Sequence, residues 1–182
     1  MSLHLREFCP VTETEDLIAF LTGESWPFHG VAKLTEETVR EQIANGRYHS
    51  DEGKKTFWAV DEGEQRVGLV RVFELGDPTP MFDLRIAERY RGRGYGLAAL
   101  RLLVEYVFTT YEDKPRLEGH TRFDNHAMRK VLHHAGFVKE AVHRQAWPSA
   151  DGQLHDSIGY AILREDWLHN TVTPIQWDDF PY

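Results

Sequence analysis

The spacing of hydrophobic and polar residues changes at one point in the middle of the chain. Before it, Phe82, Leu84 and Ile86 alternate with polar residues, and this period of two predicts a strand with two unlike faces. After it, apolar residues recur at helical spacing up to residue 110 and predict a long helix with one buried side. The apolar positions of this helix are Leu97, Leu100, Val104, Val107 and Phe108. Segment 81–110 therefore reads as strand, turn and helix.

The same patterns predict further elements on both sides of this segment. The elements predicted before segment 81–110 are a strand over 3–9, a helix that ends at Gly23, a helix over 35–46 and a hairpin of strands 56–60 and 66–74. After it they are a strand over 116–121, a helix over 125–136, strands over 138–146 and 154–163, and a short helix or tail from 165. This order of elements predicts an α/β (α+β layered) chain with a mixed sheet.

Polar residues indicate where three of these helices begin. Thr12 or Thr14 is a candidate cap for the first helix and Thr35 for the second. Asp124 or Asn125 is a candidate cap for the helix that follows strand 116–121. A side-chain oxygen at such a position accepts a hydrogen bond from an amide of the first turn that has no partner within the helix.

Length, charge and cysteine content exclude some classes of protein. A chain of 182 residues buries about 70% of its unfolded surface, so we expect one domain over residues 1–182. The formal net charge of −8 argues against nucleic-acid binding, which needs a broad basic face. No segment has the apolar length of a membrane span and no signal-peptide pattern opens the chain, so we expect a cytoplasmic protein without membrane association. The single cysteine, Cys9, excludes an internal disulfide, and its place in a predicted strand indicates a packed thiol.

The turn between the central strand and the long helix has the composition of an anion-binding loop. It reads Arg-Gly-Arg-Gly-Tyr-Gly over residues 91–96, and Arg89 precedes it. Glycine lets the backbone fold tightly and approach a ligand closely. Amides that enter a helix lie at the positive end of its dipole, so the turn favours phosphate oxygens. A turn that needs glycine for packing alone is the alternative.

The residues around this turn distinguish between kinds of phosphate ligand. A P-loop would need Gly-Lys-Ser/Thr at its end, and a dinucleotide fingerprint would need glycine where Leu97 stands. The pattern Arg/Gln-x-x-Gly-x-Gly/Ala after a strand is that of the coenzyme A loop of the GNAT N-acetyltransferase superfamily. Arg91, Gly94 and Gly96 occupy its defined positions. The turn therefore resembles a coenzyme A site.

From Arg91 onward the chain resembles the RimJ/RimL branch of that superfamily. The matching residues of the helix over 125–136 are Asn125, Val131, Leu132, Ala135, Gly136 and Phe137. Those that match the closing part of the branch pattern are Arg144, Asp151, Gly152, Asp156, Tyr160, Leu163, Glu165, Asp166 and Trp167. The N-terminal third resembles the family only in the order of its elements.

This resemblance implies a fold and a division of the chain. The implied fold is a mixed, mostly antiparallel seven-stranded sheet with helices on both faces and a V-shaped splay between the fourth and fifth strands. Residues 1–80 would form the acceptor side, residues 81–167 the acetyl-CoA-binding core and residues 168–182 a C-terminal tail. The end of this tail, residues 177–182, either covers a partner subunit or lies loose, so a monomer and a homodimer are both expected states.

The resemblance also implies acetyl-CoA as the donor and indicates the residues that hold it. The amides of the turn would hold the diphosphate, and the backbone of the central strand would pair with the pantetheine arm. Asn125 would bond the same arm, serve as a plain helix cap, or do both. The implied donor-binding residues are Leu84, Arg85, Ile86, Arg91, Gly92, Arg93, Gly94, Tyr95, Gly96 and Asn125.

The expected reaction is acetyl transfer to a primary amine, which must attack the thioester in its neutral form. A lysine-like amine has a pKa of about 10.4, so freeing its lone pair near neutral pH costs about 4–5 kcal/mol. An α-amine with a pKa of about 7.7–8.0 costs only about 1 kcal/mol. A general base is therefore important for the first kind of acceptor and dispensable for the second.

The chain departs from the family pattern at two positions that often carry the catalytic acid or base. Leu132 stands where many relatives have a tyrosine, and Pro80 where some have a glutamate. The catalytic candidates that remain are Glu118, Asp83 and His120. Glu118 is also placed for a salt bridge with Arg116 or Arg122 on its own strand. Catalysis with water in place of an enzyme base is the alternative.

A turn-rich aromatic segment supplies the candidates for acceptor binding. Trp26, Phe28 and His29 would line a pocket between the first two helices, and the alternative is that they are hydrophobic anchors. The 10 histidines of the chain include no set at the spacing of metal ligands, so no metal is expected.

These observations predict an acetyl-CoA-dependent N-acetyltransferase whose acceptor is a small amine or a protein or peptide N-terminus. The acidic chain would attract a cationic acceptor. Leu132 and Pro80 favour the alternative of a non-catalytic GNAT-like module that binds or senses coenzyme A. A nucleotide-binding protein is a third interpretation of the glycine turn.

Overall fold

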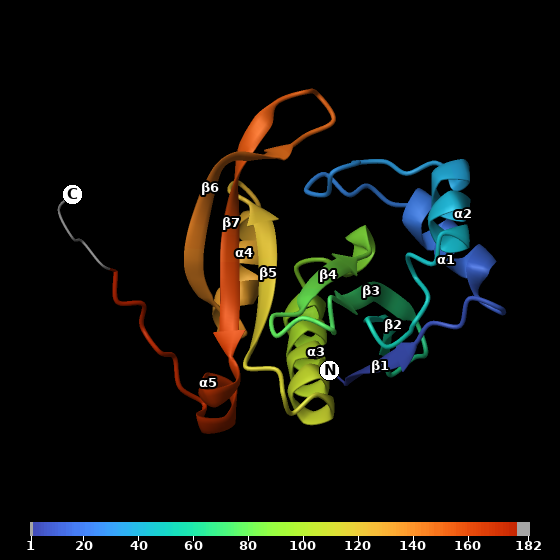
Figure 1. Ribbon diagram of the computed structural model, residues 1–182. Helices are drawn as coiled ribbons and strands as arrows, with labels where there is room; N and C mark the ends of the chain where they lie inside the picture. Colours follow the sequence, from blue (N-terminus) through green and yellow to red (C-terminus); the bar gives the residue numbers. More distant parts are fainter. Residues whose placement is uncertain (1, 178–182) are drawn as a thin grey trace.

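The computed structural model describes residues 2–177 and contains every element predicted from the sequence (Figure 1). The strands are β1 (Leu3–Glu7), β2 (Lys54–Asp61), β3 (Arg66–Phe73), β4 (Met81–Ile86), β5 (Arg116–Arg122), β6 (Val138–Pro148) and β7 (Leu154–Leu163). The helices are α1 (Thr14–Thr22), α2 (Glu36–Ala44), α3 (Tyr95–Thr110), α4 (His126–His134) and α5 (Arg164–His169), with one 3-10 turn at Glu88–Tyr90. The strand and helix that flank the glycine turn are β4 and α3. Residues 178–182 of the predicted tail lie outside the described part.

Two predictions for the N-terminal segment are wrong. The residue before α1 is Glu13 and not a capping threonine, because Thr14 donates its hydroxyl hydrogen to a backbone carbonyl at 2.7 Å. The carboxylate of Glu13 accepts from the amide of Cys9 at 2.9 Å, beyond the end of β1, and Cys9 is exposed and not packed. The start of α2 is as predicted, since Thr35 Oγ1 accepts from the amide of Thr38 at 3.2 Å.

The seven strands form one mixed sheet in the order β1-β2-β3-β4-β5-β7-β6, which confirms the predicted sheet. All neighbouring strands are antiparallel except β4 and β5, which are parallel. That parallel pair is joined at a single register position, Met81 opposite Glu118. Figure 1 shows the result as two groups of strands, β1–β4 and β5–β7, that meet where α3 crosses. The predicted V-shaped splay lies at this junction.

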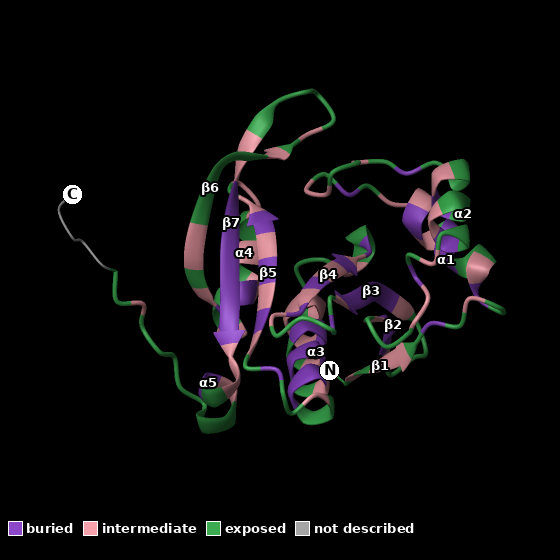
Figure 2. Cartoon of the chain, viewed as in Figure 1, coloured by how far each residue is buried: buried purple, intermediate pink, exposed green. Residues whose placement is uncertain are grey.

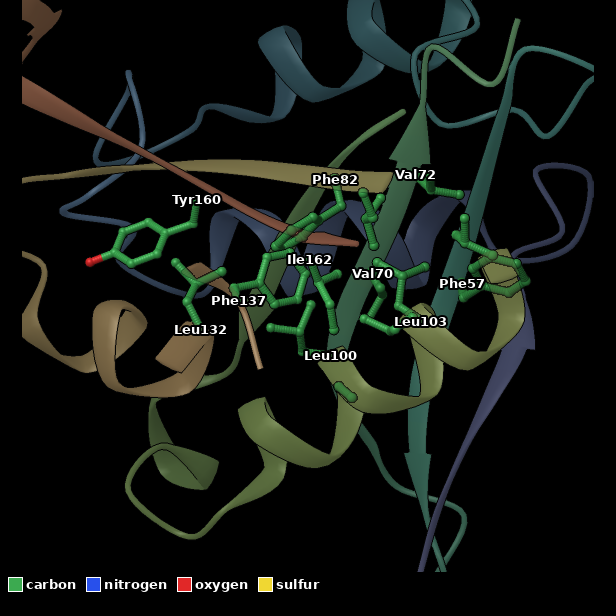
Figure 3. Packing of buried hydrophobic residues seen from close by; sticks show 14 of the residues in the cluster. Phe57, Val70, Val72, Phe82, Leu100, Leu103, Leu132, Phe137, Tyr160 and Ile162 are labelled. Atoms are coloured by element: carbon green, nitrogen blue, oxygen red, sulfur yellow. The ribbon is translucent and has the colours of Figure 1, made fainter. Parts of the chain in front are cut away.

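One face of the sheet carries α3 and α4 and the larger hydrophobic core. The predicted stripe of α3 packs here, with Leu100, Val104, Val107 and Phe108 at most 2% exposed, while Leu97 is partly exposed. Figure 2 shows that β3 and β7 are buried along most of their length and that β6 is exposed or partly exposed. The side chains labelled in Figure 3 are Phe57, Val70, Val72, Phe82, Leu100, Leu103, Leu132, Phe137, Tyr160 and Ile162. This core fixes α3 and the glycine turn at its start.

The opposite face of the sheet is covered by α1, α2 and the segment between them. Its core joins Leu17, Leu21 and Val39 of the helices to Trp58 and Leu69 of the sheet. Helices therefore cover both faces, as predicted.

The polar face of β4 is directed toward this second layer and not toward solvent. Asp83 of β4 lies opposite Arg71 of β3, and Arg85 is only 7% exposed. The period-two pattern correctly separated the two faces of β4, but it did not predict that the charged face is buried.

Candidate active site

Beyond Met81, the edge of β4 that faces β5 has no strand paired to it in the described part of the chain. The amide of Ala87 donates to Val67 of β3 at 3.0 Å. Because peptide groups alternate direction along an antiparallel strand, those of Leu84 and Ile86 point away from β3, toward the splay. This edge is a row of donors and acceptors that an extended ligand can pair with.

The glycine turn has the backbone conformation that an anion cradle needs. Gly92 has φ +71° and Gly94 has φ +86°, and within residues 2–177 no heavy atom beyond the adjoining residues lies within 4 Å of the position that a Cβ would take at either. Gly94 is the residue before α3, and no side chain of the described residues caps the helix there. The amides of Tyr95 and Gly96 stand in the first turn of α3, where helix geometry provides no acceptor for them. The turn therefore offers open backbone donors at a positive helix end.

The side chain of Arg91 braces this turn. Its Nε donates to the carbonyl of Ile86 at 2.8 Å, and its Nη2 donates to the carbonyl of Ser25 at 2.8 Å. The guanidinium also lies 5.4 Å from the ring centre of Trp26. Arg91 thus ties the end of β4 to the segment after α1, while Arg93 in the same turn is exposed.

Asn125 caps α4, as predicted. Its Oδ1 accepts from the amide of Met128 at 3.2 Å, and its Nδ2 donates to Thr121 Oγ1 at 3.0 Å. The other candidate, Asp124, pairs instead with Arg122 at 2.6 Å. Asn125 also lines the cavity described next, so the cap and a ligand contact are compatible roles.

A cavity of about 490 Å³ opens beside the splay. Its wall includes Phe28, His29, Asp83, Leu84, His120 and Asn125, which come from the loop after α1, from β4, from β5 and from the start of α4. Two of the three predicted acceptor residues, Phe28 and His29, therefore lie here. Trp26 does not: it is 2% exposed in the core beneath α1, and its Nε1 donates to the carbonyl of Leu21 at 2.9 Å.

Asp83 is the carboxylate of this cavity, and it is paired on two sides. His29 Nε2 lies 3.1 Å from its Oδ1, and Arg85 Nε donates to its Oδ2 at 3.3 Å. Burial raises the pKa of Asp83, but the charge of Arg85 and the hydrogen bond from His29 outweigh burial and hold that pKa well below its usual range. A carboxylate with so low a pKa is a weak base.

Replacing Asp83 with asparagine leaves Arg85 and Arg71 without their buried counter-charge. We expect Asp83→Asn to lower the free energy of unfolding at neutral pH by about 3 kcal/mol. Because the folded-state pKa is depressed, the stabilisation from Asp83 is complete above about pH 5 and is lost as the pH falls below about 4 toward the folded pKa. The difference between the two proteins in urea unfolding should therefore shrink in acid.

The exposed Asp16 provides the matched control for that measurement. It pairs with the partly exposed Arg66 at 2.9 Å, so Asp16→Asn should change stability little. Equal stability of Asp83→Asn and the parent protein at neutral pH, or a difference that grows in acid, would contradict the assigned charge pairing.

The other two catalytic candidates lie next to each other on β5. His120 Nε2 is 2.6 Å from Glu118 Oε1, and the second oxygen of Glu118 accepts from Arg116 at 3.0 Å. The predicted strand salt bridge is thus formed with Arg116 and not with Arg122. Arg116 also donates to Glu140 of β6 at 2.5 Å. Of the pair, only His120 lines the cavity.

The two positions that depart from the family pattern carry no chemistry here. Leu132 is 1% exposed and packs in the α3–α4 core (Figure 3). The carbonyl of Pro80 accepts from the amide of Glu118 at 3.0 Å and so holds β4 against β5. Among the described residues, no group of three or more His, Cys, Asp or Glu side chains could hold a metal ion. None of the described helices is long and apolar enough to cross a membrane.

Two charged residues of the cavity wall were not among the sequence candidates: Arg47, just after α2, and Arg71 on β3. Arg71 interrupts an apolar run between Val70 and Val72 and is 6% exposed. A charged residue within an apolar strand pattern was the feature of the sequence that could have identified Arg71 as a site residue.

A seven-stranded mixed sheet that splays at its one parallel pair, with a glycine turn leading into the next helix, is the GNAT fold. Residues 2–138 match the family described as acetyltransferase (GNAT) domain, so the chain belongs to the GNAT acetyltransferase family. No curated protein sequence matches the chain significantly.

Solved structures similar to this chain include several acetyltransferases. A chimera of the Vibrio cholerae spermidine N-acetyltransferase SpeG and hSSAT superposes with a TM-score of 0.77 at 19% identity, covering 92% of this chain and 99% of the other. The V. cholerae spermidine N-acetyltransferase in complex with CoA and spermine gives 0.75 at 19% identity, over 91% and 98%. A GNAT-family acetyltransferase from Bacillus anthracis gives 0.76 at 18% identity, over 91% and 96%. Similarity at this level of identity establishes the fold alone.

Proposed function

We propose that this protein transfers an acetyl group from acetyl-CoA to a primary amine by direct attack on the thioester. One observation carries the proposal: the unpaired edge of β4 leads from the glycine turn at the start of α3 to a cavity that contains His120. The solved spermidine N-acetyltransferase with CoA and spermine bound has the same fold and supports a donor and an amine acceptor of these kinds.

The donor side of the site fits acetyl-CoA. Open amides over residues 92–96 suit the diphosphate, because glycine at 92 and 94 leaves no side chain in the way. Leu84 presents its amide and carbonyl, and Ile86 its amide, to the pantetheine arm in the manner of an added strand. The carbonyl of Ile86 already accepts from Arg91, and Asn125 lies at the same cavity. When bound, acetyl-CoA supplies an activated acetyl group as a thioester.

We assign proton transfer to His120. His120 Nε2 is hydrogen-bonded to the carboxylate of Glu118. The other ring nitrogen, Nδ1, is therefore the one that takes a proton from the acceptor ammonium. Glu118, itself held by Arg116, orients the ring and balances the charge that it gains. Attack by the neutral amine then forms the C–N bond of the amide and breaks the C–S bond of the thioester. The second proton lost by the attacking nitrogen goes to the leaving thiolate, so coenzyme A departs as the thiol. Asp83 is assigned no proton transfer, since its low pKa makes it a weak base.

A thiol-release assay with acetyl-CoA over a panel of amines tests the function. The panel holds amino acids and their amides, N-terminal peptides, polyamines and aminoglycosides. We expect turnover with at least one class, accompanied by a new amide in the mass spectrum of the product. Acetyl-CoA binding without turnover across the panel would favour the non-catalytic module. Protection against heat by ATP or NAD and not by coenzyme A would favour a nucleotide-binding protein.

Other parts of the assignment remain predictions. They are membership of the RimJ/RimL branch, a cytoplasmic location, a monomeric or homodimeric state, and the roles of residues 1–80, 81–167 and 168–182.

A further inference from the structure

The cavity beside the splay carries the opposite charge to the chain as a whole. Its wall contains three arginines, Arg47, Arg71 and Arg85, and one carboxylate, Asp83. With its histidines neutral, the wall therefore has a net charge of +2 (three positive groups minus one negative), in a chain whose formal net charge is −8. An overall charge governs attraction at long range, but the ligand that binds is selected by the groups it touches.

The carboxylate of Asp83 neutralises only part of the positive charge of this wall. Asp83 is already bonded to Arg85 and His29. Arg71 and Arg85 are 6% and 7% exposed, and within residues 2–177 neither Arg71 Nε nor Arg85 Nη1 has a hydrogen-bond partner. Arg71 makes one hydrogen bond, from its Nη2 to the carbonyl of Arg47 at 2.7 Å. Buried donors without acceptors are costly, so these two nitrogens indicate a missing acceptor.

Aromatic rings hold both guanidinium groups in place, and the two groups share the single carboxylate of the cavity wall, that of Asp83. Arg71 lies 5.2 Å from the ring centre of Tyr48 and 5.6 Å from that of Phe73, and Arg85 lies 5.2 Å from that of Trp26. Aromatic rings fix a guanidinium plane but accept no strong hydrogen bond. Burial also lowers the pKa of Arg71, and the charge of Asp83, which acts in the opposite direction, does not offset burial. The arginines are thus preorganised for a ligand with an anionic group.

Resting on the proposed function, we infer that the acceptor amine carries an anionic group, a carboxylate or a phosphate, that binds Arg71, Arg85 and Arg47. A guanidinium fork matches either group with paired hydrogen bonds. The amine at the other end of the acceptor then lies toward His120, which lines the same cavity. Phe28, Phe73 and Trp147 line it as well and suit an apolar body between the two ends. A polyamine would bring further positive charge to an arginine wall and is disfavoured.

Matched amines that differ only in the anionic group test this inference. β-Alanine, L-phenylalanine and para-(aminomethyl)benzoate are each compared with their primary amides in the thiol-release assay, with aminoethylphosphonate and spermidine alongside. We expect kcat/KM for the preferred carboxylate to exceed that for its amide by about 10-fold or more, as a charge-assisted bidentate contact would give. A preference for the phosphonate would identify phosphate as the source of the anion. Turnover in which the amides or spermidine equal or exceed every anionic amine would overturn the inference and leave the proposed function intact.

A binding measurement tests the anion site independently of whether the protein catalyses the reaction. If no amine is turned over, the proposed function fails, and calorimetric titration of the same amines in the presence of coenzyme A still compares the carboxylates with their amides. Measurable binding of a carboxylate, about 10-fold tighter than that of its amide, supports the anion site. Equal or weaker binding of the carboxylates contradicts it.

A variant of the exposed Arg47 links the effect to this wall. Arg47→Gln should raise KM for the anionic amine about 10-fold and leave KM for its amide unchanged. The matched control is Arg40→Gln on α2, which removes the same charge from a surface pair with Glu15 outside the cavity. Arg71→Gln should have the larger effect, and thermal unfolding shows whether that variant is folded. Equal changes in KM for the anionic amine and its amide would contradict the assignment.

Discussion

Replacing Gly94 with aspartate is expected to weaken acetyl-CoA binding by about 100-fold. Gly94 stands immediately before α3, where the first-turn amides are open. A carboxylate there would face the diphosphate of the donor at close range, and repulsion of about 3 kcal/mol corresponds to that loss in affinity. Isothermal titration with acetyl-CoA measures the change directly.

Gly94→Asn is the control that separates charge from backbone strain. Gly94 has φ +86°, a conformation that asparagine and aspartate tolerate better than other side chains. Both variants introduce the same shape and a similar strain at this positive φ. We therefore expect the asparagine variant to bind acetyl-CoA within a few-fold of the parent protein and both variants to lower its melting temperature by a similar small amount. Similar loss of binding in the two variants would show that shape and not charge matters at this turn.

Replacing His120 with glutamine is expected to lower kcat by about 100- to 1000-fold, the usual contribution of a general base. The KM for acetyl-CoA should be unchanged, because His120 lines the cavity beside the splay and not the glycine turn. The loss should be largest for acceptors with a lysine-like amine and smallest for α-amines, whose deprotonation costs less. Steady-state kinetics with one acceptor of each kind measures both effects.

His143 provides the matched control for His120. Its ring centre lies 5.6 Å from that of His120, but it is exposed and does not line the cavity. His143→Gln should therefore leave kcat unchanged. Glu118→Gln, which removes the charge that orients His120, should lower kcat by about 10-fold. A His120→Gln enzyme as active as the parent would indicate that water serves as the base.

The parts of the site that depend on backbone geometry were predictable from the sequence. Alternating residues in β4, helical spacing in α3 and the glycines between them fix a strand–turn–helix whose local geometry depends on few distant contacts. The cap at Asn125 has the same local origin, since its acceptor and donor are only three residues apart. The splay between β4 and β5 was predicted from the resemblance to a known family, because the residue pattern alone does not encode it.

The acceptor side could not be predicted in the same way, because it is made by contacts between distant segments. His29 meets Asp83 across 54 residues of sequence, and Arg71 reaches the carbonyl of Arg47 across 24. Trp26 is an aromatic residue of the kind that often binds ligands, but it lies in a core that forms only when α1 packs on the sheet. Net charge was equally uninformative, since an acidic chain encloses a basic cavity.

The central claim is that coenzyme A pairs with the open edge of β4 and places its diphosphate on the amides at the start of α3. A crystal structure of the protein with coenzyme A bound tests it most directly. We predict hydrogen bonds from the amides of residues 92–96 to the diphosphate, pairing of Leu84 and Ile86 with the pantetheine arm, and the sulfur at the mouth of the cavity that His120 lines. Coenzyme A bound elsewhere, or a diphosphate held by side chains away from this turn, would contradict the account.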